Sequence, residues 1–501
     1  MGDMKIDRNI DKNIEKVRSM FEDCEDVVER KFAVHQGEQT GYIYVVYIDG
    51  LCDNELVEER VIKPVTYQWR NSKSQNLWDA MNTYQTQSAD MDIETELDEV
   101  VYAVLKGDTG IFVSDSDKAF VLSSKSLPVR GVDESATEGG MRGARDSFNE
   151  SIRMSTALIR RRIKDTALKV HQDHIGVRSR TDYAIMYIKG IAKEELVENV
   201  KNRLNEYDID AIFDSGMAEH LMERKWYRPF PLFQATTRPD KAAAAIVDGR
   251  VVVAFDNSPE VLIAPATINT LFQTSDDYYN RWPVATFARI IRYIAAFIAV
   301  GLPGFYIAVT CFHREIIPEK LLYAIADARS GLSFPIFVEV LIMELLFELL
   351  REAGIRLPSQ MGNTIGIVGG LIVGQSAVEA GIVSTIVVIV VALTAIASFA
   401  IPNEVFASTF RLLKFVAILM AALWGLYGFL ISMLCLIIYL SGMESFGVPY
   451  MSPIVHAGGV VAEENRDFIM RSPIKFLKHR PDFAHKDEKI RLRKRDDSEQ
   501  K

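Results

Sequence analysis

The sequence predicts an α/β (α+β) soluble N-terminal region in two subdomains, followed by an all-α polytopic transmembrane bundle. Residues 1–282 carry charges every few positions, and turn signals separate short apolar runs of strand and helix character. Residues 287–440 instead hold long apolar stretches with few charges, and about 20 such residues cross a bilayer core. The mean hydropathy of +0.06 therefore averages two parts that prefer different solvents.

These changes of composition divide the chain into four expected parts. They are cytoplasmic α/β subdomains at 1–130 and 131–282, a transmembrane helical domain of four to six spans at 283–445, and a charged cytoplasmic tail at 446–501. The N-terminus is charged throughout and lacks an apolar signal segment, so we expect this end of the chain to stay in the cytoplasm. The net charge of −10 disfavours a nucleic-acid partner, because phosphate-binding surfaces carry a basic excess.

In the first subdomain, residues 7–30 have apolar positions at helical spacing among charges. GYIYVVYIDG at 41–50 is a β-branched and aromatic run that ends in Asp-Gly, which predicts a strand and a turn. The runs VVYAVL, TGIFV and KAFVLSS within 100–124 predict three short strands of a meander.

The second subdomain begins with a predicted amphipathic helix at 147–168, which contains a run of three arginines. A strand at 181–190 and an amphipathic helix at 192–207 follow. Residues 242–256 predict a hairpin around an Asp-Gly pair, and 260–267 predict another strand. This alternation indicates an α/β or α+β fold.

Four apolar stretches are candidates for crossing the membrane. Residues 287–309 qualify and contain Pro303, which removes a backbone hydrogen bond. Residues 362–378 are shorter and rich in glycine, whereas 382–401 form the clearest span. Residues 410–440 exceed one crossing, so we expect this segment to be tilted or broken near Gly425 and Gly428.

Basic residues precede the first span and follow the last one, so both flanks are expected in the cytoplasm and the number of crossings should be even. Four crossings with one interfacial acidic helix satisfy this condition, although Arg411 and Lys414 then lie on the outer side. Six crossings, with the acidic helix spanning and the last segment folded as a hairpin, are the alternative.

The acidic helix at 334–354 is the main candidate for function. A charged group at the bilayer centre costs about 2.5–3.5 kcal/mol at least, so the glutamates in this apolar stretch need an explanation. Glu344, Glu348 and Glu352 form one stripe, from which Glu339 is offset. We predict that Glu344, Glu348 and Glu339 attract cations along a pore. The alternative is an interfacial helix whose carboxylates are solvated or paired with Arg351 and Arg356.

The glycine-rich segment is a candidate for close helix packing or for gating, because small residues at four-residue spacing let helices approach. The residues concerned are Gly366, Gly369 and Gly370, together with Pro303 in the first span. No Ser/His/Asp arrangement, HExxH or Walker motif is present, so we expect neither an enzyme nor a catalytic residue. None of the four cysteines has a CxxC partner or a suitably spaced histidine, so we expect no metal site and no cofactor.

Several stretches between Glu134 and Pro453 together resemble the GerA family of spore germination proteins. They are ESATEGGMRGARDSFNESI, LIRRRIKDTAL, RPFPLFQATTRPDKAAAAIVDGRVVVAFDNSPEVLIAP, SDDYYNRW, LPGFYIAVTCFHREIIPEKL, LLREAGIRLPSQMGNTIGIVGGLIVGQSAVEAGIVS and FGVPYMSP. The family often has prolines where this chain has Ser135 and Ala144, and the first 130 residues match less clearly. A paralogous branch associated with the SpoVA proteins shares the architecture, and VYIDGLCDNEL makes that branch an alternative to an A-type receptor subunit.

The resemblance implies a multi-pass protein of the spore inner membrane (a cell membrane) that forms a homo-oligomer. It implies an ion channel that releases monovalent cations during germination, or the channel-like A subunit of a nutrient germinant receptor. The implied partners are a B-type transporter-like subunit and a C-type lipoprotein, or the SpoVA-associated proteins. The alternative function is a non-conducting scaffold that assembles germination partners. A secondary transporter is less favoured, because the sequence lacks internal symmetry.

Overall fold

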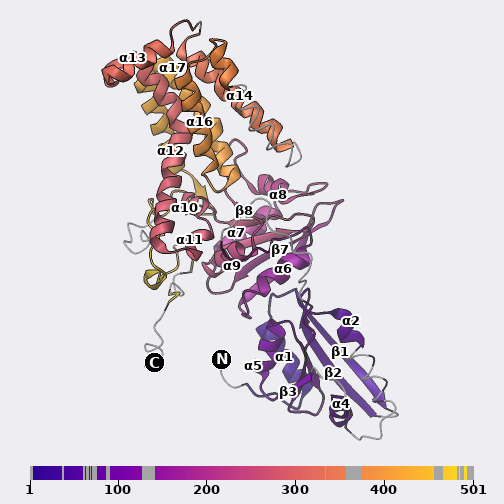
Figure 1. The fold of residues 1–501 in the computed structure, drawn as a ribbon. Helices are drawn as coiled ribbons and strands as arrows, with labels where there is room; N and C mark the ends of the chain where they lie inside the picture. The colour runs from indigo at the N-terminus through magenta and orange to yellow at the C-terminus, as the bar shows by residue number, and fades with distance from the viewer. Residues whose placement is uncertain are drawn as a thin grey trace. The chain divides into compact units, whose positions relative to one another are not determined.

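The computed structural model describes residues 4–36, 39–59, 63, 67, 69, 76–85, 91–126, 142–332, 334–356, 374–455, 467–481, 484–485 and 490–492. The chain divides into two compact units. We call the first, made of Met1–Trp226, Phe233–Pro265 and Lys478–Lys501, the α/β unit, and the second, made of Tyr227–Leu232 and Ala266–Leu477, the helical unit. Figure 1 gives the labels of their elements.

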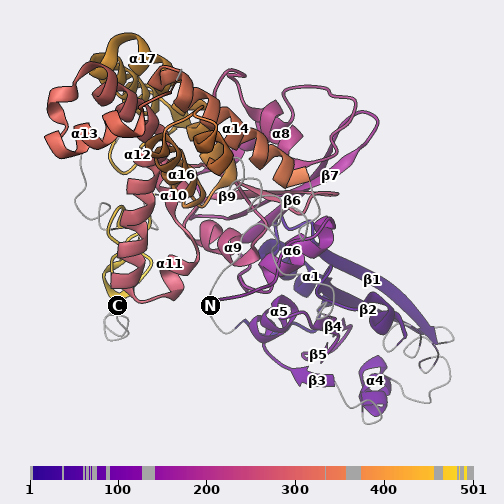
Figure 2. The same ribbon diagram turned by 45° about the horizontal axis from the view of Figure 1, so that its top comes forward.

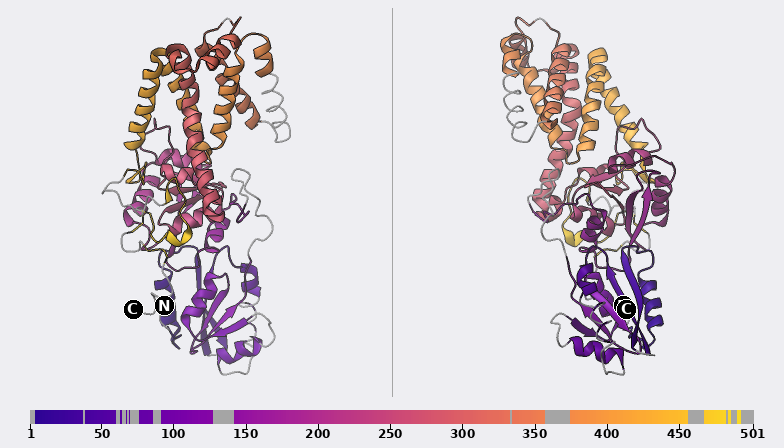
Figure 3. Two further views of the ribbon diagram at one scale, coloured as in Figure 1. Left: turned by 60° about the vertical axis from the view of Figure 1, so that its left-hand side comes forward. Right: turned by 90° about the vertical axis from the view of Figure 1, so that its right-hand side faces the viewer.

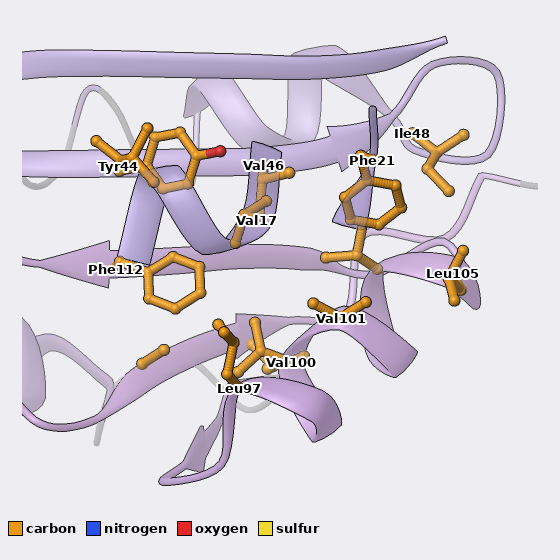
Figure 4. Packing of buried hydrophobic residues seen from close by; sticks show 14 of the residues in the cluster. Val17, Phe21, Tyr44, Val46, Ile48, Leu97, Val100, Val101, Leu105 and Phe112 are labelled. Carbon is orange, nitrogen blue, oxygen red and sulfur yellow. The ribbon is translucent and has the colours of Figure 1, made fainter. Parts of the chain in front are cut away.

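The α/β unit begins with a five-stranded antiparallel sheet of order β1-β2-β4-β5-β3. Its strands are β1 (Val27–Gln36), β2 (Gln39–Ile48), β3 (Met91–Glu94), β4 (Thr109–Val113) and β5 (Ala119–Leu122), and its helices are α1 (Ile10–Met20), α2 (Asn54–Val57), α4 (Leu77–Gln85) and α5 (Leu97–Leu105). Figure 4 shows side chains of α1 and α5 packed on those of the sheet, among them Val17, Tyr44, Val100 and Phe112. Successive side chains of a strand point to opposite faces of the sheet. A second core, which includes Ile43, Leu77 and Phe120, lies on the opposite face of this sheet.

A second antiparallel sheet follows, with the order β6-β7-β9-β10-β8. Its strands are β6 (Leu168–Ile175), β7 (Thr181–Ile188), β8 (Gln234–Thr236), β9 (Val251–Phe255) and β10 (Val261–Ala264), and its helices are α6 (Ile152–Arg160), α7 (Glu194–Leu204), α8 (Ser215–Met222) and α9 (Pro239–Val247). Figure 2 shows α6 and α9 beside this sheet, and their apolar side chains share one core with β6, β7, β9 and β10. The predicted α/β region in two subdomains is confirmed.

A buried ion pair ties the two sheets together. Arg160, at the end of α6, donates from Nε and Nη2 to the carboxylate of Asp26, over 2.7 and 2.8 Å. Both side chains are almost fully buried. A planar guanidinium that grips a carboxylate with two bonds fixes orientation as well as distance.

Two strand predictions in this unit are wrong. Val100–Leu105 belongs to α5, because Leu97, Val100, Val101 and Val104 recur at helical spacing and all face the core. Residues 242–247 belong to α9, which has Pro239 in its first turn and then a run of alanines, the best helix formers. The Asp-Gly pair that suggested a hairpin ends this helix, and Gly249 has a φ of +93° there.

The helical unit contains α10 (Ile268–Phe272), α11 (Asp276–Tyr279), α12 (Trp282–Phe312), η2 (Arg314–Ile316), α13 (Glu319–Ala328), α14 (Ile336–Arg356), α16 (Thr385–Phe399) and α17 (Glu404–Ser441). The strands β11 (Glu444–Ser445) and β12 (Val448–Pro449) and the turn η4 (Ile474–Phe476) complete it. Two of the described helices, α12 and α17, are long and apolar enough to cross a membrane. The clearest span of the sequence, α16, has only 15 residues in the structure.

The helix α17 reverses direction at Gly425, which has a φ of +61° and a ψ of −138°. The ring of Phe230 lies 5.8 Å from that of Phe410, before the break, and 6.1 Å from that of Tyr439, after it. Figure 3 shows α17, drawn in gold, reaching the same end of the helical unit as α13. A β-carbon at residue 425 would lie 2.7 Å from Cγ of Phe312, so the turn needs glycine. The predicted break at Gly425 is confirmed, and it makes α17 a helical hairpin.

Candidate functional site

The acidic helix α14 brings its glutamates against the first arm of α17. Pro335 precedes the helix, and its carbonyl oxygen accepts hydrogen bonds from the backbone of Val338 and Glu339, which starts the first turn. Glu339 and Glu344 are fully buried, whereas the side chain of Glu348 is 36% exposed. The helix therefore carries carboxylates into the packed interior of the helical unit.

Glu344 is paired with Lys414 of α17. The Lys414 ammonium donates to Oε2 of Glu344 over 2.5 Å, and the two side chains are 2% and 1% exposed. The second oxygen of Glu344, Oε1, has no hydrogen-bond partner among the described residues. Removing two charges from water is costly, and the cost is recovered only when each charge has the other as a close partner.

Glu348 extends this pair into a chain of alternating charges between α14 and α17. Lys414 lies 3.9 Å from its carboxylate, Arg351 lies 3.2 Å from it, and Arg411 lies 3.6 Å from it. Arg351 also donates to Glu404 over 3.0 Å. Three carboxylates thus face three cations, and this ion-pair chain, made of Glu344, Glu348, Glu404, Arg351, Arg411 and Lys414, carries no net charge.

Glu339 lies apart from this chain, as its helical offset predicts. Its Oε1 lies 3.2 Å from Nη2 of Arg329, and its Oε2 accepts a 3.0 Å hydrogen bond from the backbone N–H of Ser384. Ser384 is the N-cap of α16, and a carboxylate is stabilised at a helix N-terminus by the free N–H groups and the dipole there. Glu352, at the other end of α14, makes an exposed pair with Arg356 at 2.6 Å.

The residues predicted for packing or gating fall into two groups. Gly366, Gly369 and Gly370 lie outside the described residues. Pro303 is buried within α12, which continues as a helix on both sides of it. The next residue, Gly304, sits against α17: a β-carbon there would lie 3.0 Å from the carbonyl oxygen of Ala417. The described residues therefore place a close helix contact in α12, at the glycine that follows Pro303.

A second buried ionic network lies near the start of α12. Arg289 donates from Nη1 to Asp467 over 2.8 Å and from Nε to Asp277 over 3.2 Å, and Arg292 also donates to Asp277. Both arginines are largely buried. The sequence predicted the basic residues here only as the flank of the first span, whereas the structure places these two in a buried ionic network. Sequence reasoning missed this network because Asp467 is far from Arg289 along the chain. No described group of three or more His, Cys, Asp or Glu side chains is arranged to hold a metal ion.

Comparison with known proteins places these features in a family. Residues 15–483 match the model of the Bacillus/Clostridium GerA spore germination protein. Spore germination protein KA of Bacillus subtilis (strain 168) is 37% identical over 488 residues, which cover 97% of this chain and 88% of that protein. The uncharacterized membrane protein YfkQ of the same organism is 36% identical over 479 residues, covering 96% of this chain and 92% of the relative.

Stage V sporulation protein AF of Bacillus subtilis (strain 168) is 30% identical over 493 residues, covering 97% of both chains. Among solved structures, the N-terminal domain of the A subunit of the Bacillus megaterium spore germinant receptor GerK3 is 25% identical. The match covers 54% of this chain and 99% of that domain, with a TM-score of 0.43. Because the family model spans nearly the whole chain and the relatives are matched over most of their length, this chain belongs to the GerA family of spore germination proteins.

Proposed function

We propose that the protein is a multi-pass subunit of the spore inner membrane that forms an oligomeric cation channel during germination. Its N-terminal α/β unit lies in the cytoplasm in this proposal. Membership of the GerA family and the apolar helices α12 and α17 support a place in the membrane. The hairpin in α17 favours six crossings, with α14 spanning, over the four-crossing alternative.

The observation that carries the conducting function is the ion-pair chain between α14 and α17. Buried ionisable groups among apolar helices are expensive, and in membrane proteins they concentrate on ion pathways. In the described conformation Lys414 neutralises Glu344, so this carboxylate has no net negative charge to offer a cation. Separation of α14 from Lys414 would release Glu344 and Glu348 to bind monovalent cations, with Glu339 as a further carboxylate at the other end of the path.

The ion-pair chain therefore acts as a lock in this proposal. Its closed form carries no net charge and keeps the Glu344–Lys414 pair buried, and its open form exposes two carboxylates to the pore. The force that opens it would come from the partners of a receptor A subunit, a B-type transporter-like subunit and a C-type lipoprotein, or from the SpoVA-associated proteins. Both kinds of relative match this chain over most of their length, which keeps both sets of partners in the proposal.

Potassium release from liposomes that contain the purified protein, with and without its B-type partner, tests the proposal. With the partner present, we expect release from the native protein and a severalfold slower release from a Glu344→Gln, Glu348→Gln variant, whereas the native protein alone should stay closed. Glu352→Gln is the matched control, because Glu352 is an exposed glutamate at the end of the same helix. Equal release from all three proteins would remove the carboxylates from the path. No release from folded oligomers, even with the partner present, would favour the non-conducting scaffold.

A further inference from the structure

A short segment of the helical unit is pinned to both arms of the hairpin α17. This segment, Tyr227–Leu232, belongs to the helical unit although it comes from an earlier part of the chain. The ring of Phe230 lies 5.8 Å from that of Phe410 in the first arm and 6.1 Å from that of Tyr439 in the second. Phe230 is 1% exposed, so these contacts fix the segment at the base of the hairpin.

The base of the hairpin lies at the membrane–water boundary in the proposed function, on which this inference rests. The first arm of α17 runs from Glu404 to the break at Gly425, which is about 30 Å at the rise of an α-helix. This length matches the hydrocarbon core of a bilayer, so the start of the arm stands at the edge of that core. Thr409, near this start, donates to the carbonyl oxygen of Pro229. The segment therefore meets the layer of lipid headgroups.

The chain that leads into this segment carries aromatic and basic side chains. Tyr227 is 59% exposed, and Arg228 follows it. The three residues before Tyr227 along the chain are Arg224, Lys225 and Trp226, and all three are exposed. Trp226 is 91% exposed. Three residues of chain reach at most about 11 Å, so these five residues form one short stretch with three cations and no carboxylate. We call Arg224–Arg228 the basic–aromatic segment.

These residue types fit the chemistry of a lipid surface. Trp and Tyr are enriched at membrane–water interfaces, because each has an apolar ring and a polar N–H or O–H group. Lys and Arg clusters beside a membrane helix are attracted to the anionic lipids of the cytoplasmic leaflet. Trp is well buried on average in soluble proteins, so an almost fully exposed Trp226 next to an exposed Tyr227 indicates a surface that a second phase covers.

We propose that the basic–aromatic segment binds anionic phospholipid headgroups of the cytoplasmic leaflet. Trp226 and Tyr227 place their rings among the headgroups, and the three cations lie against the phosphates. Because Phe230 joins the segment to both arms of α17, this contact holds the base of the hairpin at a fixed depth. A zwitterionic lipid such as phosphatidylcholine fits the surface less well than phosphatidylglycerol, since its net charge is zero.

Lipid quenching of the native tryptophans tests this proposal in the full-length protein, held in nanodiscs of phosphatidylcholine and phosphatidylglycerol. Bromine atoms on the acyl chains quench a tryptophan that touches the lipid, and the quenching lost in a Trp→Phe variant is the share of that tryptophan. We expect Trp226→Phe to lose a large share when phosphatidylglycerol is brominated. Trp69→Phe is the matched control and should lose none, because Trp69 is 3% exposed. Trp424→Phe, at a 56% exposed position beside the break in α17, reports whether the hairpin itself lies in the bilayer.

A charge variant tests the choice of anionic lipid. One basic residue near an anionic membrane surface corresponds to about a fivefold enrichment. Brominated phosphatidylglycerol should therefore quench Trp226 at least severalfold more than the same fraction of brominated phosphatidylcholine. In the triple variant Arg224→Gln, Lys225→Gln, Arg228→Gln, both brominated lipids should quench it equally.

Three results would overturn the assignment, and they separate it from the proposed function. Quenching that is lost in Trp424→Phe but kept in full in Trp226→Phe would place α17 in the bilayer and the basic–aromatic segment away from it, which refutes this inference alone. Quenching that neither variant lowers would remove both positions from the lipid, and with them the membrane placement of the proposed function. Equal quenching of Trp226 by both lipids in the native protein would show contact without recognition of anionic headgroups.

Discussion

Replacement of Lys414 by Met should be among the most damaging single changes in the helical unit. The side chains of Lys414 and Glu344 are 2% and 1% exposed and lie 2.5 Å apart, so Lys414→Met leaves a buried carboxylate without a counter-charge. Removing one partner of a buried pair costs roughly 3–5 kcal/mol. Glu344→Leu should cost less, roughly 2 kcal/mol, because Lys414 keeps Glu348 at 3.9 Å. The double variant, Lys414→Met with Glu344→Leu, should have a free energy of unfolding within about 1 kcal/mol of that of the native protein, since both charges are then gone.

Denaturant unfolding of the purified protein in mixed micelles measures these three free energies. The exposed pair of Glu352 and Arg356 provides the control, and Glu352→Gln should change the free energy of unfolding by less than about 0.5 kcal/mol. A double variant whose loss equals the sum of the two single losses would refute the reasoning, because independent sites add. A Lys414→Met loss below that of Glu344→Leu would refute the stated role of Glu348.

Two further predictions concern the α/β unit. Burial, with the nearby charges of Glu223 and Glu260, raises the pKa of Glu219 to about 8. The folded protein then binds a proton that the unfolded chain has lost, so stability should fall as pH rises from about 4.5 to 8. Glu219→Gln should remove that fall and be more stable than the native protein by about 2 kcal/mol at pH 8, but not at pH 4, in thermal unfolding. Asp26→Asn should lower the free energy of unfolding by roughly 3 kcal/mol, because it leaves the buried guanidinium of Arg160 without a counter-charge. A native-like melting temperature for this variant would contradict the prediction.

Local sequence patterns predicted the strands well where β-branched and aromatic residues were concentrated between turn signals. The run at 41–50 became β2, and the runs TGIFV and KAFVLSS became β4 and β5, because β-branched and aromatic residues alternate there between two buried faces. The errors in α5 and α9 share one cause. Short apolar runs fit a strand or a buried helix equally well, and in both elements the flanking acidic or proline residues of the first turn decided for a helix.

The sequence predicted the carboxylates of the candidate site but not the cations that pair with them. The cost of burying charge in an apolar helix drew attention to Glu339, Glu344 and Glu348 from the sequence alone. Their partners were not predictable, because Lys414 lies 70 residues from Glu344 and nothing in the local pattern pairs them. In the four-crossing arrangement, Lys414 and Arg411 would lie on the outer side of the membrane, against the rule that basic residues stay in the cytoplasm. The ion pairs now account for both cations, since each faces a carboxylate of α14.

Charge reversal at the Glu344–Lys414 pair tests most directly the claim that this pair holds a cation path closed. Potassium release would be measured from liposomes with Lys414→Glu, with Glu344→Lys and with the doubly reversed protein. We predict continuous release from Lys414→Glu, in which like charges force α14 and α17 apart and add a carboxylate to the path. The doubly reversed protein should be closed again, because it restores the pair in the opposite sense. A tight Lys414→Glu variant, or a double variant that leaks as fast as Lys414→Glu, would contradict the account.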